Sequence, residues 1–226
     1  MAINACLMRA GLTKGLDRTK ISGLPWRNPE TPPRALTGMA EATDEELMLR
    51  YRDGDARAFE VLYVRHKGPV YRYILRQCGV AATAEELFQD VWMNLIKARE
   101  RYEVHAKFTT WLYTLAHNRV VDYYRRQAAG LPISYDDDPD DEPLIEKVPD
   151  SEQKQPDNEF ERRRQAQQLL ELLKQLPEAQ REAFLLREES GLSLEEIAEV
   201  TGVNAETAKS RLRYALAKLR QGMKEH

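Results

Sequence analysis

Apolar residues between positions 43 and 127 recur every three or four residues, which is the spacing of one face of a helix. No stretch of the chain alternates apolar and polar residues, as a half-buried strand requires. The expected fold class is therefore all-α. The pattern predicts helices around 43–53, 58–66, 84–99 and 109–127.

The same periodicity returns in residues 161–226. Leucines from Leu169 to Leu176 form one apolar face, which stops at Pro177. A second helix is expected over Glu178–Glu189, and two shorter ones on either side of a turn at Gly202. The second half of the chain therefore also predicts a helical domain.

Local signals mark several helix ends. A Ser or Thr that precedes a Glu by three residues forms a capping box, in which side chain and backbone cap each other. The chain has Thr43 with Glu46, Thr83 with Glu86, and Ser193 with Glu196. Asn204 is expected to cap the helix that follows, and Gly202 suits the positive φ of a tight turn.

Two stretches lack helical periodicity. Residues 1–42 hold Gly and Pro without sustained pattern, and we interpret them as a flexible extension. Residues 128–160 carry five prolines, and the segment 136–159 holds 11 acidic residues against two lysines. Such a segment buries too little apolar surface to fold. The predicted organisation is two small helical domains, 43–127 and 161–226, joined by an unstructured acidic linker over 128–160.

Charge is segregated along the chain. The formal net charge of −3 argues against nucleic-acid binding, but residues 136–159 alone carry −9, which leaves +6 elsewhere. The two cysteines, Cys6 and Cys78, are far apart and form no CxxC pair, so neither a disulfide framework nor a thiolate zinc site is expected. The chain has no apolar run long enough for membrane insertion and no secretory signal, which favours the reducing cytoplasm.

Enzymatic motifs are missing from the sequence. His66, His105 and His117 do not have the spacing of a metal site, and there is no Gly-rich phosphate loop. We therefore expect no enzyme activity, no catalytic residue, no metal and no cofactor.

The turn at Gly202 joins two helices in the arrangement of a helix-turn-helix, whose second helix lies in the major groove of DNA. Between Asn204 and Arg220 this second helix carries five basic residues against Glu206. The alternative is an ordinary amphipathic helix with a solvated basic face. The candidate DNA-binding residues are Arg187, Glu206, Thr207, Lys209, Ser210, Arg211, Arg213 and Tyr214, with Arg187 and Arg211 placed for phosphates.

Three blocks of sequence together resemble one protein family. They are AEELFQDVW at 84–92, FTTWLYTLAHN at 108–118 with DYYRR at 122–126, and a third that combines LP at 176–177, AFLLR at 183–187, GLS at 191–193, EIA at 196–198 and TAKSRL at 207–212. Their order and spacing are similar to those of the extracytoplasmic-function (ECF) group of bacterial RNA polymerase sigma factors. The chain departs from the family where the recognition helix begins, with Glu206-Thr207-Ala208 in place of a Gly-Thr-Val-like start.

The resemblance implies partners and roles. It implies binding to core RNA polymerase and promoter DNA, recognition of the minus-ten and minus-thirty-five elements, DNA melting without ATP, and control by an anti-sigma factor. Glu86, Gln89 and Asp90 would dock on the coiled-coil clamp helices of the largest polymerase subunit; the alternative is a solvated polar face. A helix-turn-helix regulator that does not act as a sigma subunit is the rival function.

The resemblance also implies a minus-ten site, with Tyr102 and Asn118 holding a base flipped out of the non-template strand. Further candidates there are Asp122, Tyr123, Arg125 and Arg126, since aromatic rings among arginines suit unstacked bases and their backbone. The alternative is that the tyrosines pack inside, the arginines face water, and Asp122 only orients Asn118. The acidic linker would act as a temporary mimic of RNA in the polymerase channel; the alternative is a passive tether.

Overall fold

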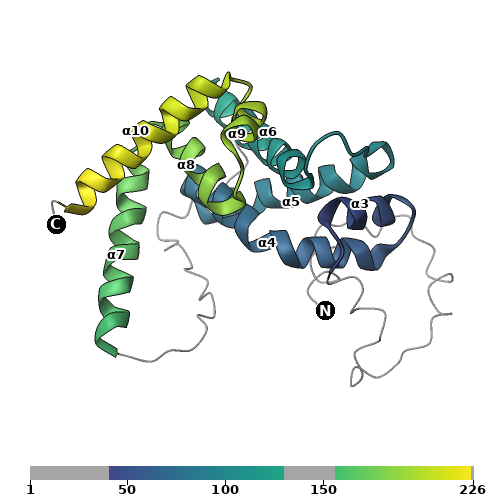
Figure 1. The fold of residues 1–226 in the computed structure, drawn as a ribbon, viewed down its shortest axis with the longest axis horizontal. Helices are drawn as coiled ribbons and strands as arrows, with labels where there is room; N and C mark the ends of the chain where they lie inside the picture. The colour runs from purple at the N-terminus through teal and green to yellow at the C-terminus, as the bar shows by residue number, and fades with distance from the viewer. Residues whose placement is uncertain (1–40, 130–155, 225–226) are drawn as a thin grey trace. The chain divides into compact units, whose positions relative to one another are not determined.

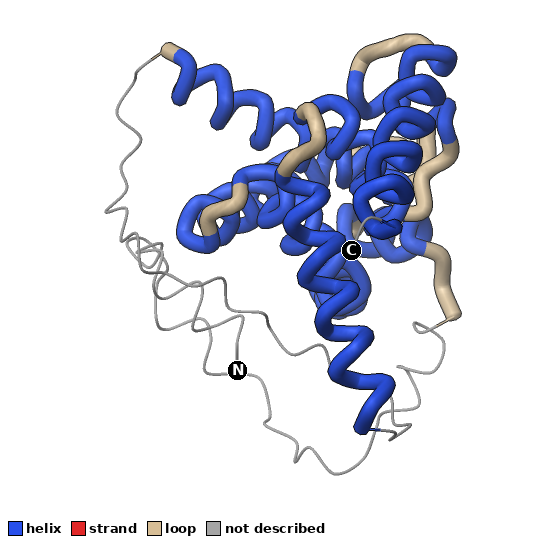
Figure 2. Tube along the Cα trace, turned by 90° about the vertical axis from the view of Figure 1, so that its left-hand side faces the viewer, coloured by secondary structure: helices blue, strands red, loops and turns tan. Residues whose placement is uncertain are grey.

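The computed structural model describes residues 41–129 and 156–224, and within these ranges the chain is helical with short connections (Figures 1 and 2). The expected all-α class is confirmed for this part of the chain. The first half contains α3 (Asp44–Arg52), α4 (Ala56–Cys78), α5 (Ala81–Ala98), the 3-10 turn η2 (Arg99–Arg101) and α6 (Phe108–Ala128). The second contains α7 (Pro156–Lys174), α8 (Glu178–Ser190), α9 (Leu194–Thr201) and α10 (Ala205–Lys224).

Most of the local signals act as expected. Thr43 and Ser193 each form a complete capping box, at the start of α3 and of α9. Gly202 ends α9 at a φ of 64°, and the side chain of Asn204 accepts a hydrogen bond of 2.7 Å from the backbone N–H of Thr207. These signals were readable because each depends only on residues within one helical turn.

The predicted start of α5 was wrong. The helix begins at Ala81, after Val80, and Thr83 lies buried inside its first turn instead of capping it. Gly79 ends α4 at a φ of 78°, which lets the chain turn directly into the next helix. Alanine at positions 81 and 82 then favours helix one turn earlier than the Thr83 signal indicates.

The predicted end of the linker was also wrong, because α7 already begins at Pro156. Proline is well suited to the first turn of a helix, where its missing N–H has no partner to lose. Residues 130–155 of the expected linker and residues 1–40 of the expected extension lie outside the described residues. The hypothesis of an RNA-mimicking linker concerns residues 136–159, of which 136–155 lie outside the described residues and 156–159 belong to α7.

The first half is organised around α4, which packs against α3, α5 and α6. Its core contains Leu62, Ile74 and Leu95, all fully buried. Full burial of each such side chain contributes about 1.5–3 kcal/mol relative to exposure. Four aromatic rings of α4 and α5, from Phe59, Tyr63, Phe88 and Trp92, contact one another with centroid separations between 4.8 and 6.3 Å.

The second half has its core in α8, where Phe184, Leu185 and Leu186 are buried, and α10 packs across α7, α8 and α9. Gly222 allows the close approach of α10 to α7, since a Cβ there would clash with the Leu172 side chain. In the part of the chain that the structure describes, none of the helices is long and apolar enough to serve as a membrane span.

The two halves contact each other, which the sequence did not lead us to expect. Helix α8 packs on α4, and α9 packs on α6, the helix that carries the predicted minus-ten residues. All of the described helices belong to one compact unit.

Asp44 anchors the start of α3 to α4. Its carboxylate lies 2.7 Å from the Arg65 guanidinium and 2.7 Å from Nε2 of His66. Burial acts to raise the pKa of Asp44, but hydrogen bonds and charge from His66 and Arg65 lower it below its ordinary value of 3.8. The folded-state pKa is therefore the lower one, so this carboxylate stabilises the fold above the unfolded-state pKa and loses that contribution as pH falls.

We expect Asp44→Asn to lose less stability than the parent chain as the pH falls below about 5, because it has no such carboxylate to protonate. The measurement is the urea midpoint of unfolding at a series of pH values. Parallel curves for the parent and the variant would show that Asp44 does not contribute to acid sensitivity.

Candidate functional site

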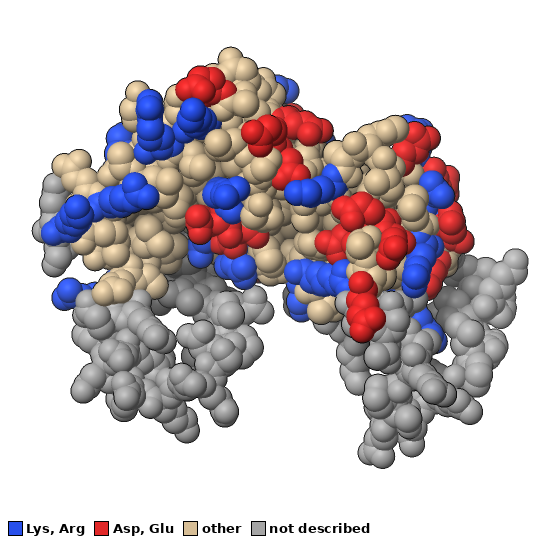
Figure 3. Space-filling model, in the orientation of Figure 1, with Lys and Arg blue, Asp and Glu red and all other residues tan. Residues whose placement is uncertain are grey.

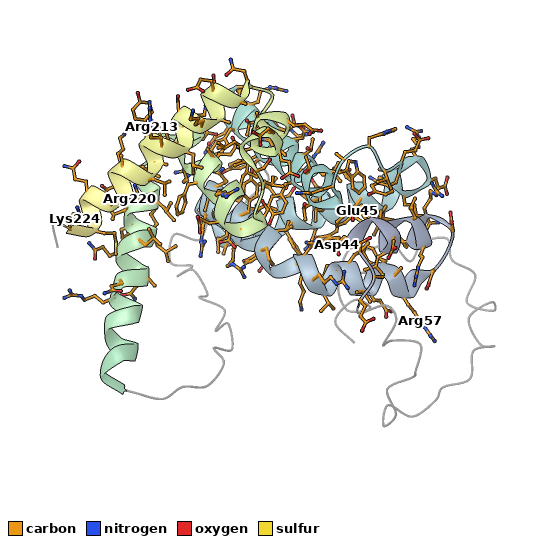
Figure 4. All side chains as sticks on the ribbon, in the orientation of Figure 1. Asp44, Glu45, Arg57, Arg213, Arg220 and Lys224 are labelled. Atoms are coloured by element: carbon orange, nitrogen blue, oxygen red, sulfur yellow. The ribbon has the colours of Figure 1, made fainter. Side chains whose placement is uncertain are left out.

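The exposed face of α10 is basic. Lys209, Arg213 and Tyr214 are exposed, whereas Ala208 and Ala215 are buried against the rest of the second half. Lys and Arg side chains gather over this helix in the space-filling view (Figure 3), and the series continues through Arg220 and Lys224 toward its end (Figure 4). The face predicted to read DNA is therefore accessible.

Two contacts organise this face. The guanidinium of Arg213 lies 5.1 Å from the ring centre of Tyr214, and Lys209 Nζ lies 3.5 Å from the carboxylate of Glu206. Both partners of the Lys209–Glu206 pair are more than half exposed, and such pairs add little stability. Lys209 can therefore exchange Glu206 for another anion at little cost.

Four other predicted residues of this half are partly buried or engaged in the fold. Thr207, Ser210 and Arg211 are partly buried. Arg187 is exposed, but its guanidinium donates a hydrogen bond of 2.8 Å to the carbonyl of Leu192 and so holds the turn between α8 and α9.

The polar face of α5 is exposed. Glu86, Gln89 and Asp90 face solvent, while Leu87 and Val91 on the opposite side are buried. The structure therefore brings together the three residues predicted to dock on the polymerase clamp helices.

Helix α6 exposes only some of its predicted residues. Asn118 is exposed, as are Arg125 and Arg126 near the end of the helix. Asp122 is partly buried and lies 3.4 Å from both Arg119 and Arg125, so its carboxylate is engaged with neighbouring arginines.

The two tyrosines near the end of α6 pack on each other, with ring centroids 5.3 Å apart. The Tyr124 hydroxyl donates a hydrogen bond to the backbone carbonyl of Gln77, and burial raises the pKa of this phenol. Tyr124 therefore fits the alternative of a packed side chain, and Tyr123 beside it is also partly buried.

Tyr102 lies at the start of the loop 102–107, between η2 and α6. Its ring is only 5% exposed and lies 4.9 Å from the ring of Trp111 and 6.5 Å from that of Phe108. Burial, with Glu45 and Asp44 nearby, raises its pKa to about 12. A base cannot stack on this ring unless the loop moves, so the structure does not offer Tyr102 as the open platform that we expected.

The three histidines discussed above each face a single carboxylate. His66 pairs with Asp44 at 2.7 Å, His105 with Glu103 at 2.9 Å, and His117 with Glu182 at 2.6 Å. Within 41–129 and 156–224, no three His, Cys, Asp or Glu side chains come together as a metal site.

Glu182 of α8 is buried where the two halves meet. Its carboxylate accepts a hydrogen bond of 2.9 Å from the Tyr73 hydroxyl and lies 2.6 Å from Nδ1 of His117. Burial, followed by the charge of Glu182, raises the pKa of Tyr73 well above 10, so this hydroxyl stays a donor at all ordinary pH values. A side chain from α8 thus binds α4 and α6 at once.

Further charged contacts join the two halves, all with the acid on the second half. The carboxylate of Glu189 lies 2.9 Å from Nε of Arg72 and also pairs with Arg76. The carboxylate of Glu196 lies 3.0 Å from Nζ of Lys107. In addition, the guanidinium of Arg181 donates to the side-chain and backbone oxygens of Gln77. The contact between the halves therefore includes ion pairs and hydrogen bonds between specific side chains.

Sequence reasoning missed Glu182, although a signal was present. It lies three and four residues before Leu185 and Leu186, on the apolar stripe of α8, and a charge on a buried stripe indicates a partner. Glu45 of α3 was also missed, because it meets the start of α6 across 63 positions of sequence.

Two family models match the chain. Residues 62–130 match sigma-70 region 2, and residues 166–219 match sigma-70 region 4. The first match contains α5 and α6, and the second contains α8, α9 and most of α10.

Characterised relatives are similar over most of their length. The chain is 34% identical to the RNA polymerase sigma factor CarQ of Myxococcus xanthus, over 77% of this chain and 94% of CarQ. It is 34% identical to the ECF RNA polymerase sigma factor RpoE of Cereibacter sphaeroides, over 83% and 99%, respectively. The ECF RNA polymerase sigma-E factor of Escherichia coli K12 is 29% identical over 76% and 90%.

Solved structures share the fold. The sigma factor RpoE of Bartonella quintana, solved in complex with the anti-sigma factor NepR, has a TM-score of 0.57 at 21% identity and covers 75% of this chain and 98% of its own. CnrH, solved in complex with the cytosolic domain of CnrY, has a TM-score of 0.54 at 22% identity, with 79% and 95% covered.

Proposed function

Because this chain belongs to the ECF group of RNA polymerase sigma factors and directs RNA polymerase to promoters, we propose that its two halves divide that task. Residues 43–127 bind core polymerase and recognise and melt the minus-ten element. Residues 161–226 recognise the minus-thirty-five element. Family membership removes the rival function of a helix-turn-helix regulator outside the polymerase, and a sigma subunit is not an enzyme.

The observation that carries the division is the order of surfaces along the chain. An exposed acidic-polar face on α5 precedes a helix with an exposed Asn118 and a basic end, and an exposed basic face on α10 follows. DNA-binding surfaces are basic because they neutralise phosphates, whereas a face that avoids DNA and docks on protein can be acidic.

In vitro transcription with core polymerase and a library of promoters tests this function. We expect the purified chain to start transcription only when core polymerase is present, from promoters that share two sequence elements. Crosslinks from residues of α10 to upstream DNA and from residues of α6 to downstream DNA would support the division of labour. Crosslinks in the reverse order would contradict it.

Lys209 and Arg213 are proposed to set recognition of the minus-thirty-five element. We expect each alanine substitution to cost about 1–3 kcal/mol in promoter affinity and to relax base preference at one position. Holoenzyme binding to a randomised upstream element measures both effects. Arg57→Ala, an exposed arginine on α4, serves as the matched control (Figure 4). Unchanged base preference in both α10 variants would move the reading face elsewhere on the helix.

Asn118, with Asp122, Tyr123, Arg125 and Arg126 near it on α6, is proposed to hold the melted minus-ten strand. Capture of an extruded base must offset an unpairing cost of a few kcal/mol. The exposure of Asn118 supports this role, since its amide offers a donor and an acceptor to a base edge. Tyr102 can join only if the loop 102–107 rearranges and frees its ring.

The proposal also includes a regulatory partner and a location in the cell. Both structural neighbours described above with TM-scores above 0.5 were solved as complexes, and the partner of the Bartonella quintana sigma factor is an anti-sigma factor. We infer that this chain also has an anti-sigma partner, and that it works in the cytoplasm beside the polymerase.

A further inference from the structure

Helix α3 precedes the first family match, which begins at residue 62, yet it contacts the loop 102–107 and the start of α6. That loop leads directly into the helix that is proposed to open the promoter. Side chains of α3 make hydrogen bonds at both ends of this loop.

Glu45 caps α6 from a distant part of the chain. Its carboxylate accepts a hydrogen bond of 2.7 Å from the backbone N–H of Phe108, the first residue of α6. The residue at the N-cap position, Lys107, supplies no side-chain hydrogen bond of its own. A carboxylate at this end of a helix satisfies an otherwise unpaired N–H and interacts favourably with the helix dipole.

Arg52, at the other end of α3, holds the beginning of the same loop. Its guanidinium donates a hydrogen bond of 3.3 Å to the carbonyl of Tyr102 and also pairs with Asp53 at 3.0 Å. One turn earlier in the chain, the guanidinium of Arg99 in η2 lies 5.4 Å from the ring centre of Tyr51. Both ends of the loop 102–107 therefore rest on α3.

Helix α3 is itself held in place by several contacts. Its capping box is complete, Leu47 and Met48 are fully buried, and Asp44 is bound to α4 through Arg65 and His66. Asp44 and Glu45 lie side by side at the start of α3, so one residue ties this helix to α4 and the next ties it to α6 (Figure 4).

We propose that Glu45 and Arg52 are positioning residues for promoter opening: they fix the two ends of the loop 102–107 and so set the start of α6. The inference rests on the proposed role of α6 at the minus-ten element. Neither residue is expected to contact DNA. Each acts through the loop, so its loss affects strand opening more than polymerase binding.

The first test compares Glu45→Ala with Glu45→Gln. The amide oxygen of glutamine can still accept from the Phe108 N–H, so this conservative variant retains most of the capping contact. We expect Glu45→Ala to reduce the permanganate reactivity of promoter thymines roughly tenfold, the order expected for one hydrogen bond to a charged group. Glu45→Gln should recover most of that loss, and polymerase affinity should stay within about twofold for both.

The second test compares Arg52→Lys, which keeps a donor, with Arg52→Ala, which does not. Arg50→Ala is the control, since it removes an exposed arginine from the same helix. Circular dichroism establishes that each variant is folded. Wild-type strand opening in both Glu45→Ala and Arg52→Ala would overturn the proposal, as would an equal loss of polymerase binding and opening.

Hydrogen exchange of the Phe108 amide separates this inference from the proposed function, because it needs neither polymerase nor promoter. We expect this amide to exchange roughly tenfold faster in the free Glu45→Ala protein than in the parent. Unchanged exchange would overturn the positioning contact itself. Faster exchange together with normal opening would show that the contact exists but does not govern melting, which overturns the positioning proposal and leaves the proposed function standing.

Discussion

Replacing Glu182 by alanine is expected to lower the free energy of unfolding by about 3 kcal/mol. Glu182 is 8% exposed and its carboxylate serves two partners, so its loss leaves the buried Tyr73 hydroxyl and the His117 ring without the acceptor they now share. Such groups cannot recover their hydration inside the protein, and that is why the cost exceeds the net value of one hydrogen bond. Urea unfolding with a fixed m-value measures it.

Two further variants test whether the loss of stability comes from the buried contact. Tyr73→Phe removes one of the two bonds and is expected to cost about half as much, while Glu188→Ala, an exposed acid on the same helix, should lie within about 0.5 kcal/mol of the parent. A Glu182→Ala protein as stable as the Glu188→Ala control would show that the buried contact is not maintained in solution.

Glu182→Ala should also cause the two halves to unfold separately. In the described part of the chain the tryptophans, Trp92 and Trp111, lie in the first half, whereas circular dichroism reports on all of the helices. We expect the fluorescence and dichroism transitions to coincide in the parent and to separate in Glu182→Ala, since coincident transitions are the mark of a single cooperative unit.

Reversing two charges on α5 is expected to have the largest effect on function. We expect Glu86→Lys with Asp90→Lys to weaken binding to core polymerase by about 2 kcal/mol or more, roughly thirtyfold, because repulsion replaces attraction at a docking face. Transcription should fall in parallel at limiting concentrations of the chain. Titration of core polymerase with fluorescently labelled variants measures the affinity.

Glu60→Lys is the control for that experiment, because it reverses an exposed charge on α4 without touching the α5 face. Circular dichroism must show that the double variant remains helical. Affinity equal to that of the parent would remove α5 from the proposed polymerase interface and leave its polar face as a solvated one.

Contacts close in sequence were predictable, and distant ones were not. The capping boxes at Thr43 and Ser193 and the turn at Gly202 depend on residues within a few positions, and all three agree with the structure. The capping signal at Thr83 was equally local, but it did not mark the start of the helix. The turn at Gly79, with Ala81 and Ala82 after it, starts the helix earlier.

The sequence by itself determined the all-α class, the family, and the exposed faces of α5 and α10, because helical periodicity shows which residues of an amphipathic helix turn away from its core. Only the tertiary structure decided which of the polar and aromatic residues are available. It buried Tyr102 beneath Trp111, joined Glu45 to Phe108, and placed Glu182 between Tyr73 and His117. Each of these contacts joins different elements of the fold, and the last crosses from one half of the chain to the other. Periodicity within one helix carries no information about the surface that another helix brings to it, and that surface decides whether a side chain faces water or a partner.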